Sequence, residues 1–285
     1  MLGGSEAGAL LRRAVDAAAG PPPRAVLLVA HPDDESVGAT ALLARLGPAA
    51  TVAYATDGAP RAMGDALAAG CATREAYAAL RRRERAAALA LAGVDAARAL
   101  DLGHADQEAW RGLVRLTEQV AALAAGAELL VTHPYEGGHP DHDACAAAAR
   151  LACELLARGG ERPPVLAECT SYHADPEAPN GLRAGAFRAH PGAGPEVVVA
   201  LDAAARARKA AMYACHASQA VVLAGLPPDP DERFRAAPDY DFTRPPPGGP
   251  VWYARYGWKV DAAAVCRAAG EARRALRLTQ AGGVA

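Results

Sequence analysis

The sequence predicts a doubly wound α/β fold, with helices on both faces of a mostly parallel, Rossmann-like sheet. Three observations predict it. The apolar run at residues 24–30 is typical of a strand buried on both faces of a parallel sheet. Strand-like and helix-like stretches then alternate over about 170 residues. The length of 285 residues and the hydrophobic content of 52% suit one large domain.

The first elements follow from periodicity and from helix-breaking residues. Residues 6–19 place Leu10, Leu11 and Val15 on one stripe, which predicts a helix that prolines end at 21–23. After the strand at 24–30, the pattern predicts a helix at 36–46, a strand at 51–56, a helix at 73–91, a strand at 98–102 and a helix at 108–124.

The same alternation continues in the second half of the chain. It predicts a strand at 128–133, a helix at 141–157 and strands at 165–172 and 196–201. Residues 226–250 are rich in proline, glycine and aspartate, which predicts an irregular loop that walls a pocket or only connects two elements. We therefore divide the chain into an N-terminal helix (1–23), an α/β catalytic domain (24–225) and a loop-rich C-terminal extension of that domain (226–285).

The composition excludes several kinds of partner. The net charge of −2 offers no field that would gather nucleic acid or an anionic membrane. Apolar runs are much shorter than the roughly 20 residues that span a bilayer, and the N-terminus lacks the pattern of a secretory signal, so we expect a cytoplasmic protein. The six cysteines have no C-x-x-C spacing, which favours reduced thiols.

Two polar clusters follow predicted strands, at the edge where such sheets bind ligands. The first reads His31-Pro32-Asp33-Asp34-Glu35, and a divalent cation is the simplest way to neutralise its crowded carboxylates. The second, at 137–143, reads Gly-Gly-His-Pro-Asp-His-Asp and opens a helix, so His139 and His142 can face the same site.

Together the clusters provide more than the three ligands that a catalytic zinc commonly uses, which leaves residues for acid and base chemistry. The alternative interpretation is that His31 and Asp34 only cap the following helix, and that the later histidines are solvated residues at a helix start.

With these residues in view, the sequence resembles the PIG-L or LmbE-like N-acetylglucosaminyl deacetylases, which carry A-H-P-D-D-E after the first strand and H-P-D-H later. Here these motifs are Ala30 to Glu35 and His139 to His142. The resemblance extends from about residue 24 to 219. It implies that His31, Asp34 and His142 bind zinc and that Asp33 is the general base. It also implies that His139 stabilises the oxyanion or protonates the leaving amine, with Asp141 orienting it.

Weaker matches extend the resemblance. Arg81 and Asp106 fall where family members contact sugar hydroxyls, although Arg81 also fits a solvated basic run. Further matches are Thr56-Asp57-Gly58, Glu84, Lys209 and His216 to Gln219, of which His216 also fits a buried structural histidine. One position departs from the family: some sugar deacetylases have a mobile tyrosine where this chain has Gly137, and Tyr135 lies two residues earlier.

The expected function is therefore zinc-dependent removal of an acyl group, acetyl above all, from an amino sugar, a sugar conjugate or a natural-product glycoside. Fe²⁺ could replace zinc, because the same ligands accept either metal. A homo-oligomer is compatible with the sequence. Two alternatives stay open: a catalytically silent carbohydrate-binding relative, which would not need Asp33, and a metal-dependent phosphoester hydrolase, which would need further carboxylates from other strands.

Overall fold

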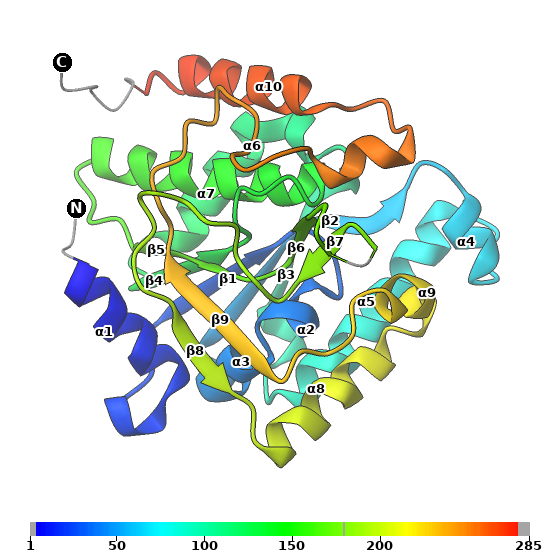
Figure 1. Ribbon diagram of the computed structural model, residues 1–285, viewed down its shortest axis with the longest axis horizontal. Helices are drawn as coiled ribbons and strands as arrows, with labels where there is room; N and C mark the ends of the chain where they lie inside the picture. The colour runs from blue at the N-terminus through cyan, green and yellow to red at the C-terminus, as the bar shows by residue number, and fades with distance from the viewer. Residues whose placement is uncertain (1–3, 179, 279–285) are drawn as a thin grey trace.

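The computed structural model, which describes residues 4–178 and 180–278, has a seven-stranded sheet at its centre (Figure 1). The strand order is β3-β2-β1-β4-β5-β9-β8, and a separate hairpin pairs β6 with β7. Five strands are parallel, whereas β9 runs antiparallel to both of its neighbours. The strands are β1 (Ala25–Val29), β2 (Ala50–Pro60), β3 (Ala99–Asp106), β4 (Leu129–Thr132), β5 (Val165–Cys169), β6 (Tyr172–Ala174), β7 (Leu182–Ala184), β8 (Val197–Ala200) and β9 (Asp231–Ala236).

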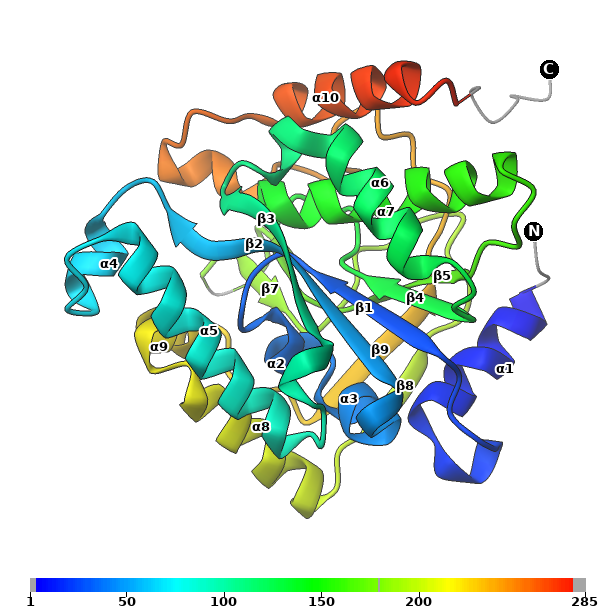
Figure 2. The ribbon, with the colours of Figure 1, turned by 180° about the vertical axis from the view of Figure 1, so that it is seen from behind.

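Helices cover both faces of the sheet, as Figure 2 shows from behind. One layer packs beneath the sheet in Figure 1, and it contains α1 (Gly4–Val15), α3 (Thr40–Leu46), α5 (Arg74–Leu91) and α8 (Ala203–Cys215). The opposite layer contains α6 (Leu113–Ala124), α7 (Pro140–Arg158) and α10 (Ala262–Ala275). Shorter helices are α2 (Asp34–Gly38), α4 (Gly64–Ala68) and α9 (Ala220–Ala224). The predicted fold class is confirmed.

The side chains of β1 alternate between the two faces of the sheet, and all of them are buried. Leu27 and Val29 belong to the core beneath the sheet, whereas Val26 and Leu28 belong to the core on the other face. Successive side chains of a strand point to opposite faces, so a strand between two helical layers must be apolar throughout. This is why residues 24–30 lack polar alternation.

The helical connections between parallel strands switch from one face of the sheet to the other beside β1. The connections from β1 to β2 and from β2 to β3 run through α3 and α5 on one face, and those from β3 to β4 and from β4 to β5 run through α6 and α7 on the other. The loops after β1 and β4, which are hydrogen-bonded neighbours, therefore diverge and leave space at their carboxyl ends. Both polar clusters lie there.

The strand expected at 165–172 ends at Cys169, and residues 172–174 belong to the separate hairpin. Two further local predictions are wrong. The single helix expected at 36–46 is interrupted at Ala39, and α3 starts afresh because the carboxylate of Glu232 accepts hydrogen bonds from the backbone N–H groups of Thr40 (2.9 Å) and Ala41 (2.8 Å). Residues 226–250 are not wholly irregular, since β9 lies among them and forms an internal strand of the sheet. In both cases the local structure is decided by contact with a segment that is distant in sequence.

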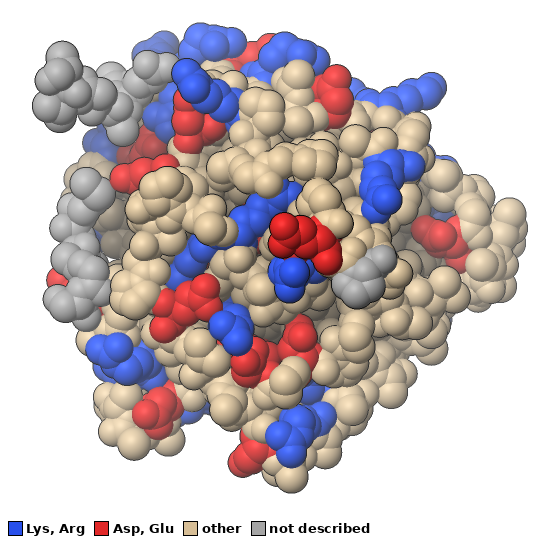
Figure 3. All heavy atoms as spheres, in the orientation of Figure 1, with Lys and Arg blue, Asp and Glu red and all other residues tan. Residues whose placement is uncertain are grey.

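The surface carries no dominant charge. In Figure 3 basic and acidic side chains are interspersed over the face shown. Within the described ranges, no helix has the length and apolar character needed to cross a membrane. All six cysteines are free.

Candidate metal centre

The loop after β1 holds an unusual backbone. Asp33 has φ 137° and ψ −28°, a conformation that residues with a side chain rarely adopt. Its carbonyl accepts from the N–H of Ser36 (2.9 Å) and Val37 (3.1 Å) at the start of α2, and its N–H donates to Glu35 Oε2 (2.9 Å). These bonds hold Asp33 and Asp34 at the sheet edge, pointing into the site in different directions.

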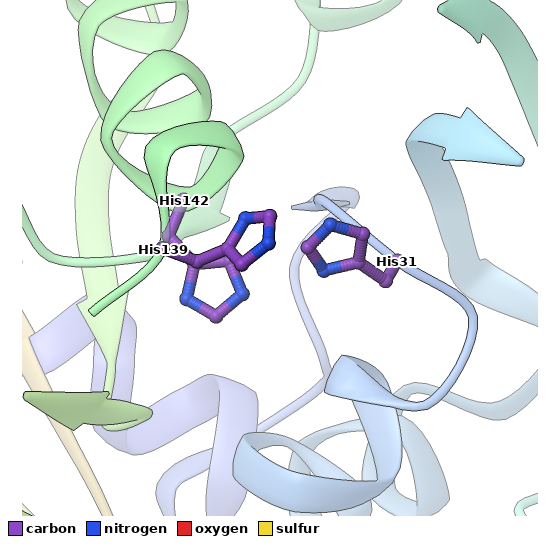
Figure 4. A group of neighbouring side chains, drawn as sticks. All are labelled: His31, His139 and His142. Carbon is purple, nitrogen blue, oxygen red and sulfur yellow. The ribbon is translucent and has the colours of Figure 1, made fainter. Parts of the chain in front are cut away.

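Three histidines converge from the two loops. Figure 4 shows His31 reaching from the loop after β1 towards His139 and His142, which come from the start of α7. The His31 ring centroid is 4.4 Å from that of His139 and 5.4 Å from that of His142. All three side chains are buried.

Carboxylates surround His31. Its Nδ1 lies 3.3 Å from Asp34 Oδ2, while its Nε2 lies 3.1 Å from Asp106 Oδ1 and 3.3 Å from Asp141 Oδ2. Asp106 ends β3, so a third strand contributes to the site. Burial opposes a charge on His31, but Asp106 and the other two carboxylates outweigh it and raise the pKa of His31 well above its usual value. Without a cation, this ring holds a proton among three carboxylates.

Asp34 lies between two stacked histidines. Its Oδ1 is 3.2 Å from His142 Nε2 and its Oδ2 is 3.4 Å from His133 Nε2. Burial would raise the pKa of Asp34, yet His142 and His133 hold it well below its usual range. Burial and then His133 lower the pKa of His142 to about 3, so this pair is a carboxylate beside a neutral imidazole. Those are the protonation states of metal ligands.

His139 begins α7 as its N-cap, and its Nδ1 accepts the backbone N–H of Asp141 (3.2 Å). Its Nε2 is therefore the ring nitrogen without a described hydrogen bond. The role predicted for Asp141 in orienting this ring stays a prediction: its backbone N–H donates to Nδ1, and its carboxylate lies 4.0 Å from Nδ1. That carboxylate instead accepts the N–H groups of Gln107 (2.6 Å) and Ala109 (2.9 Å), which ties the loop after β3 to α7.

These donors fit a divalent cation. Among the described residues, three overlapping groups place one potential ligand atom per residue within 4.8 Å: His31-His139-His142, His31-Asp106-His139-Asp141 and Asp34-His133-His142. His142 Nε2 and Asp106 Oδ1 are buried and lie near their neighbours without forming hydrogen bonds within the described part of the chain. Unpartnered lone pairs at that spacing are what a bound cation would satisfy.

His133 is a weaker ligand candidate than His142, because its Nε2 accepts the backbone N–H of Ala30 (3.0 Å). It instead supports the loop after β1 and the Asp34 carboxylate. The sequence pattern predicted only that His133 ends a strand. Its position one residue beyond the buried strand β4 was the available signal.

Arg81 reaches the site from α5 and is buried. It donates to Asp33 Oδ2 (2.7 Å), to the carbonyl of Gly58 (2.6 Å) and to the carbonyl of Pro32. Gly58 has φ 63°, and a Cβ there would lie 2.6 Å from the guanidinium. Arg81 is therefore not part of a solvated run, and its described contacts are to the loop of Asp33 and to the end of β2.

The other weak sequence matches form internal supports. Glu84 accepts from the N–H (2.8 Å) and hydroxyl (2.6 Å) of Ser218. Lys209 donates to Glu232 (3.1 Å), and His216 Nε2 lies 3.2 Å from Glu35 Oε1. These contacts join α5 to the loop after α8, α8 to β9, and the loop after α8 to the first polar cluster.

The two positions around the second motif have structural partners. Gly137 accepts a hydrogen bond from the N–H of Trp252 (2.7 Å), and its N–H donates to Asp143 Oδ1 (3.0 Å). Tyr135 is buried and donates to the carbonyl of Arg244 (2.7 Å). Tyr135 therefore points away from the histidines, into the core beside α10.

Residues 26–153 match the family model described as GlcNAc-PI de-N-acetylase, PIG-L. The matched segment contains both polar clusters and Arg81 and Asp106. No curated protein sequence matches the chain.

Several solved structures share the fold. A triple mutant of a deacetylase from the teicoplanin biosynthetic pathway is 22% identical with a TM-score of 0.57, covering 74% of this chain and 96% of the other. The zinc-inhibited form of teicoplanin deacetylase is 18% identical with a TM-score of 0.52, covering 74% and 97%. The 4-carboxy-2-hydroxymuconate hydratase GalB of Pseudomonas putida is 16% identical with a TM-score of 0.50, covering 74% and 95%. At such identities the likeness establishes the fold, and the hydratase shows that this fold carries more than one reaction.

Proposed function

The chain belongs to the PIG-L, LmbE-like family, and from this premise we propose that it is a metal-dependent N-deacetylase. The substrate would be an N-acetylated amino sugar, a sugar conjugate or a natural-product glycoside. His31, Asp34 and His142 would hold zinc or Fe²⁺, with Asp33 as the general base.

The observation that carries this proposal is the different environment of the two adjacent aspartates. Asp34 lies between His142 and His133, as a ligand would, whereas Asp33 is turned away by its positive φ and is held by Arg81. A carboxylate that only served to bind a cation would not need this strained backbone. The geometry leaves Asp33 beside the ligands, which suits proton transfer.

A bound divalent cation would supply Lewis acidity, polarising the acyl oxygen and making a water molecule easier to deprotonate. Asp33 would accept the proton of that water, since burial and the Asp34 charge raise its pKa to about 6 while Arg81 limits the rise.

His139 would act on the other side of the amide. Burial and then His31 hold the pKa of His139 well below its usual value, so the ring is neutral. With Nδ1 accepting from Asp141, the proton is on Nε2, where it can stabilise the developing oxyanion or pass to the leaving nitrogen.

One observation supports the phosphoester alternative. Asp106 and Asp141 bring carboxylates from β3 and α7 to His31 and His139, and this four-residue group could hold a second cation. A two-metal site would favour displacement at phosphorus.

The test is metal content per chain together with acetate release from N-acetylglucosamine. We expect about one metal per chain in the wild type, a metal-free His142→Ala variant, and an Asp33→Asn variant that keeps its metal but loses about 100-fold or more in turnover. Wild-type turnover by Asp33→Asn would refute the mechanism. Two metals per chain with phosphate release would favour the phosphoesterase, and a metal-free, inactive wild type would favour the silent relative.

A further inference from the structure

Aromatic side chains border the two histidines that start α7. The ring of Trp258 lies 5.0 Å from that of His139, and the ring of Tyr172 on β6 lies 5.2 Å from that of His142. Tyr256 stacks on Trp258 with ring centroids 4.7 Å apart. We propose that Tyr172, Tyr256 and Trp258 form an aromatic subsite that binds the ring of a cyclic substrate bearing the acylamino group. This proposal rests on the proposed deacetylase function.

The segment that carries Tyr256 and Trp258 is attached to the loop of His139. The backbone N–H of Trp252 donates to the carbonyl of Gly137. Val251 packs so closely that a Cβ on Gly137 would lie 2.6 Å from Val251 Cγ1. Tyr253 donates to Asp143 Oδ2 (3.2 Å), one residue beyond His142. Since these anchors fix the segment on both sides of the second motif, Trp258 is placed relative to His139 by direct contacts.

Tyr172 is fixed by the same loop. A Cβ on Gly138 would lie 2.0 Å from the carbonyl oxygen of Tyr172, so only glycine allows β6 this close to the motif. The two glycines before His139 therefore allow two other segments, those of Val251 and Tyr172, to approach the motif closely. Val251 occupies the space beside Gly137, and the backbone carbonyl of Tyr172 occupies the space beside Gly138.

The chemistry of the two sides differs. The carboxylates of Asp106 and Asp141 lie beside His31, whereas the rings of Trp258 and Tyr172 lie beside His139 and His142. Tyr256 is 53% exposed and Trp258 is half-buried, so part of their apolar surface remains available to a ligand. An aromatic wall beside a polar reactive group suits a ring that presents an apolar face, as a pyranose or an arene does. An acyclic amide would gain little from it.

The first experiment compares a cyclic with an acyclic amide in the metal-loaded enzyme. Trp258→Ala should raise KM for N-acetylglucosamine about tenfold with little change in kcat, and should leave kcat/KM for N-acetylethanolamine unchanged. Trp258→Phe should restore most of the loss, because it keeps a ring beside His139. Trp110→Phe is the matched control, because Trp110 is a half-buried tryptophan on another segment with no described ring contact to His139 or to the three subsite rings. A fall in kcat for both amides would mean that Trp258 only supports His139, and would overturn the subsite.

A binding measurement separates this proposal from the proposed function. Titration with N-acetylglucosamine should quench the tryptophan fluorescence of the wild type and of Trp110→Phe, and the affinity should fall about tenfold in Trp258→Ala. Trp258-dependent binding without acetate release would refute the deacetylase alone. Acetate release with equal binding by the wild type and Trp258→Ala would refute the subsite alone, as would the absence of binding to the wild type.

Discussion

Arg81 Nη2 lies 2.7 Å from Asp33 Oδ2, and the same guanidinium donates to the carbonyls of Pro32 and Gly58. One buried side chain from α5 thereby joins the loop after β1 to the end of β2. It also compensates the negative charge of Asp33 at a residue whose backbone is strained. The position of the proposed base therefore depends on a helix some 50 residues later in the chain.

Replacing Arg81 with lysine should damage turnover without removing the metal. A lysine ammonium cannot match the planar fork that serves three acceptors, so Asp33 should lose its fixed direction. We expect kcat to fall about 10- to 100-fold, since small displacements of a reacting group carry costs of that size. Acetate release and metal content would be measured together, with the exposed Arg82→Lys as the control. Unchanged kcat would show that Arg81 does not position Asp33.

Ser171→Ala should weaken metal binding. Ser171 Oγ lies 3.3 Å from His142 Nδ1, where it can accept a proton from the ring when Nε2 is the ligand atom. Losing such an outer hydrogen bond typically reduces metal affinity about 10- to 100-fold. Competition with a chelator measures this, and Ser218→Ala, whose hydroxyl bonds Glu84, is the control. Equal chelator resistance in both variants would contradict the assignment of His142.

Glu136 should make a contribution to stability that falls as the pH rises from about 5 to 8. Burial, and then the charge of Glu168, raises the pKa of Glu136 to about 8, against an ordinary value of 4.5. A carboxyl group that binds its proton more tightly in the folded chain stabilises the fold below its unfolded pKa, and this contribution is lost as the pH rises towards the folded value. Glu136 Oε2 has no hydrogen-bond partner among the residues described, while Oε1 accepts from the backbone N–H of Arg188 (2.6 Å) and from Arg235 (3.3 Å), which limits the rise of the pKa.

Glu136→Gln should therefore flatten this dependence, because the amide has no proton to lose. Urea unfolding at several pH values measures it, with the exposed Glu161→Gln as the control. An equally steep decline in Glu136→Gln would show that this residue is not its source.

Lys209→Met should destabilise the fold. Lys209 and Glu232 are both buried and lie 3.1 Å apart, and Glu232 also caps α3. Removing one partner of a buried ion pair leaves the other charge uncompensated, which costs about 3–5 kcal/mol. Denaturant unfolding should show the loss, and Lys209→Met combined with Glu232→Gln should recover part of it. A loss below 1 kcal/mol, a limit set about threefold under the expected range, would contradict this role.

The sequence alone determined the α/β class, the buried strand at β1 and the two polar clusters at strand ends. These features are local: a doubly buried strand must be apolar throughout, and helical periodicity is visible within one element. Since parallel strands end at one edge, the sequence also predicted that His31 and the histidines of α7 would meet.

Only the tertiary structure decided the contacts that join distant segments. Asp106 reaches His31 from β3, Arg81 holds Asp33 from α5, and Trp258 meets His139 from a segment more than 100 residues later. The interruption before α3 and the strand β9 likewise depend on pairing between distant residues. Such contacts leave no periodic signal in the chain, because they follow from how the layers pack once the sheet order is set.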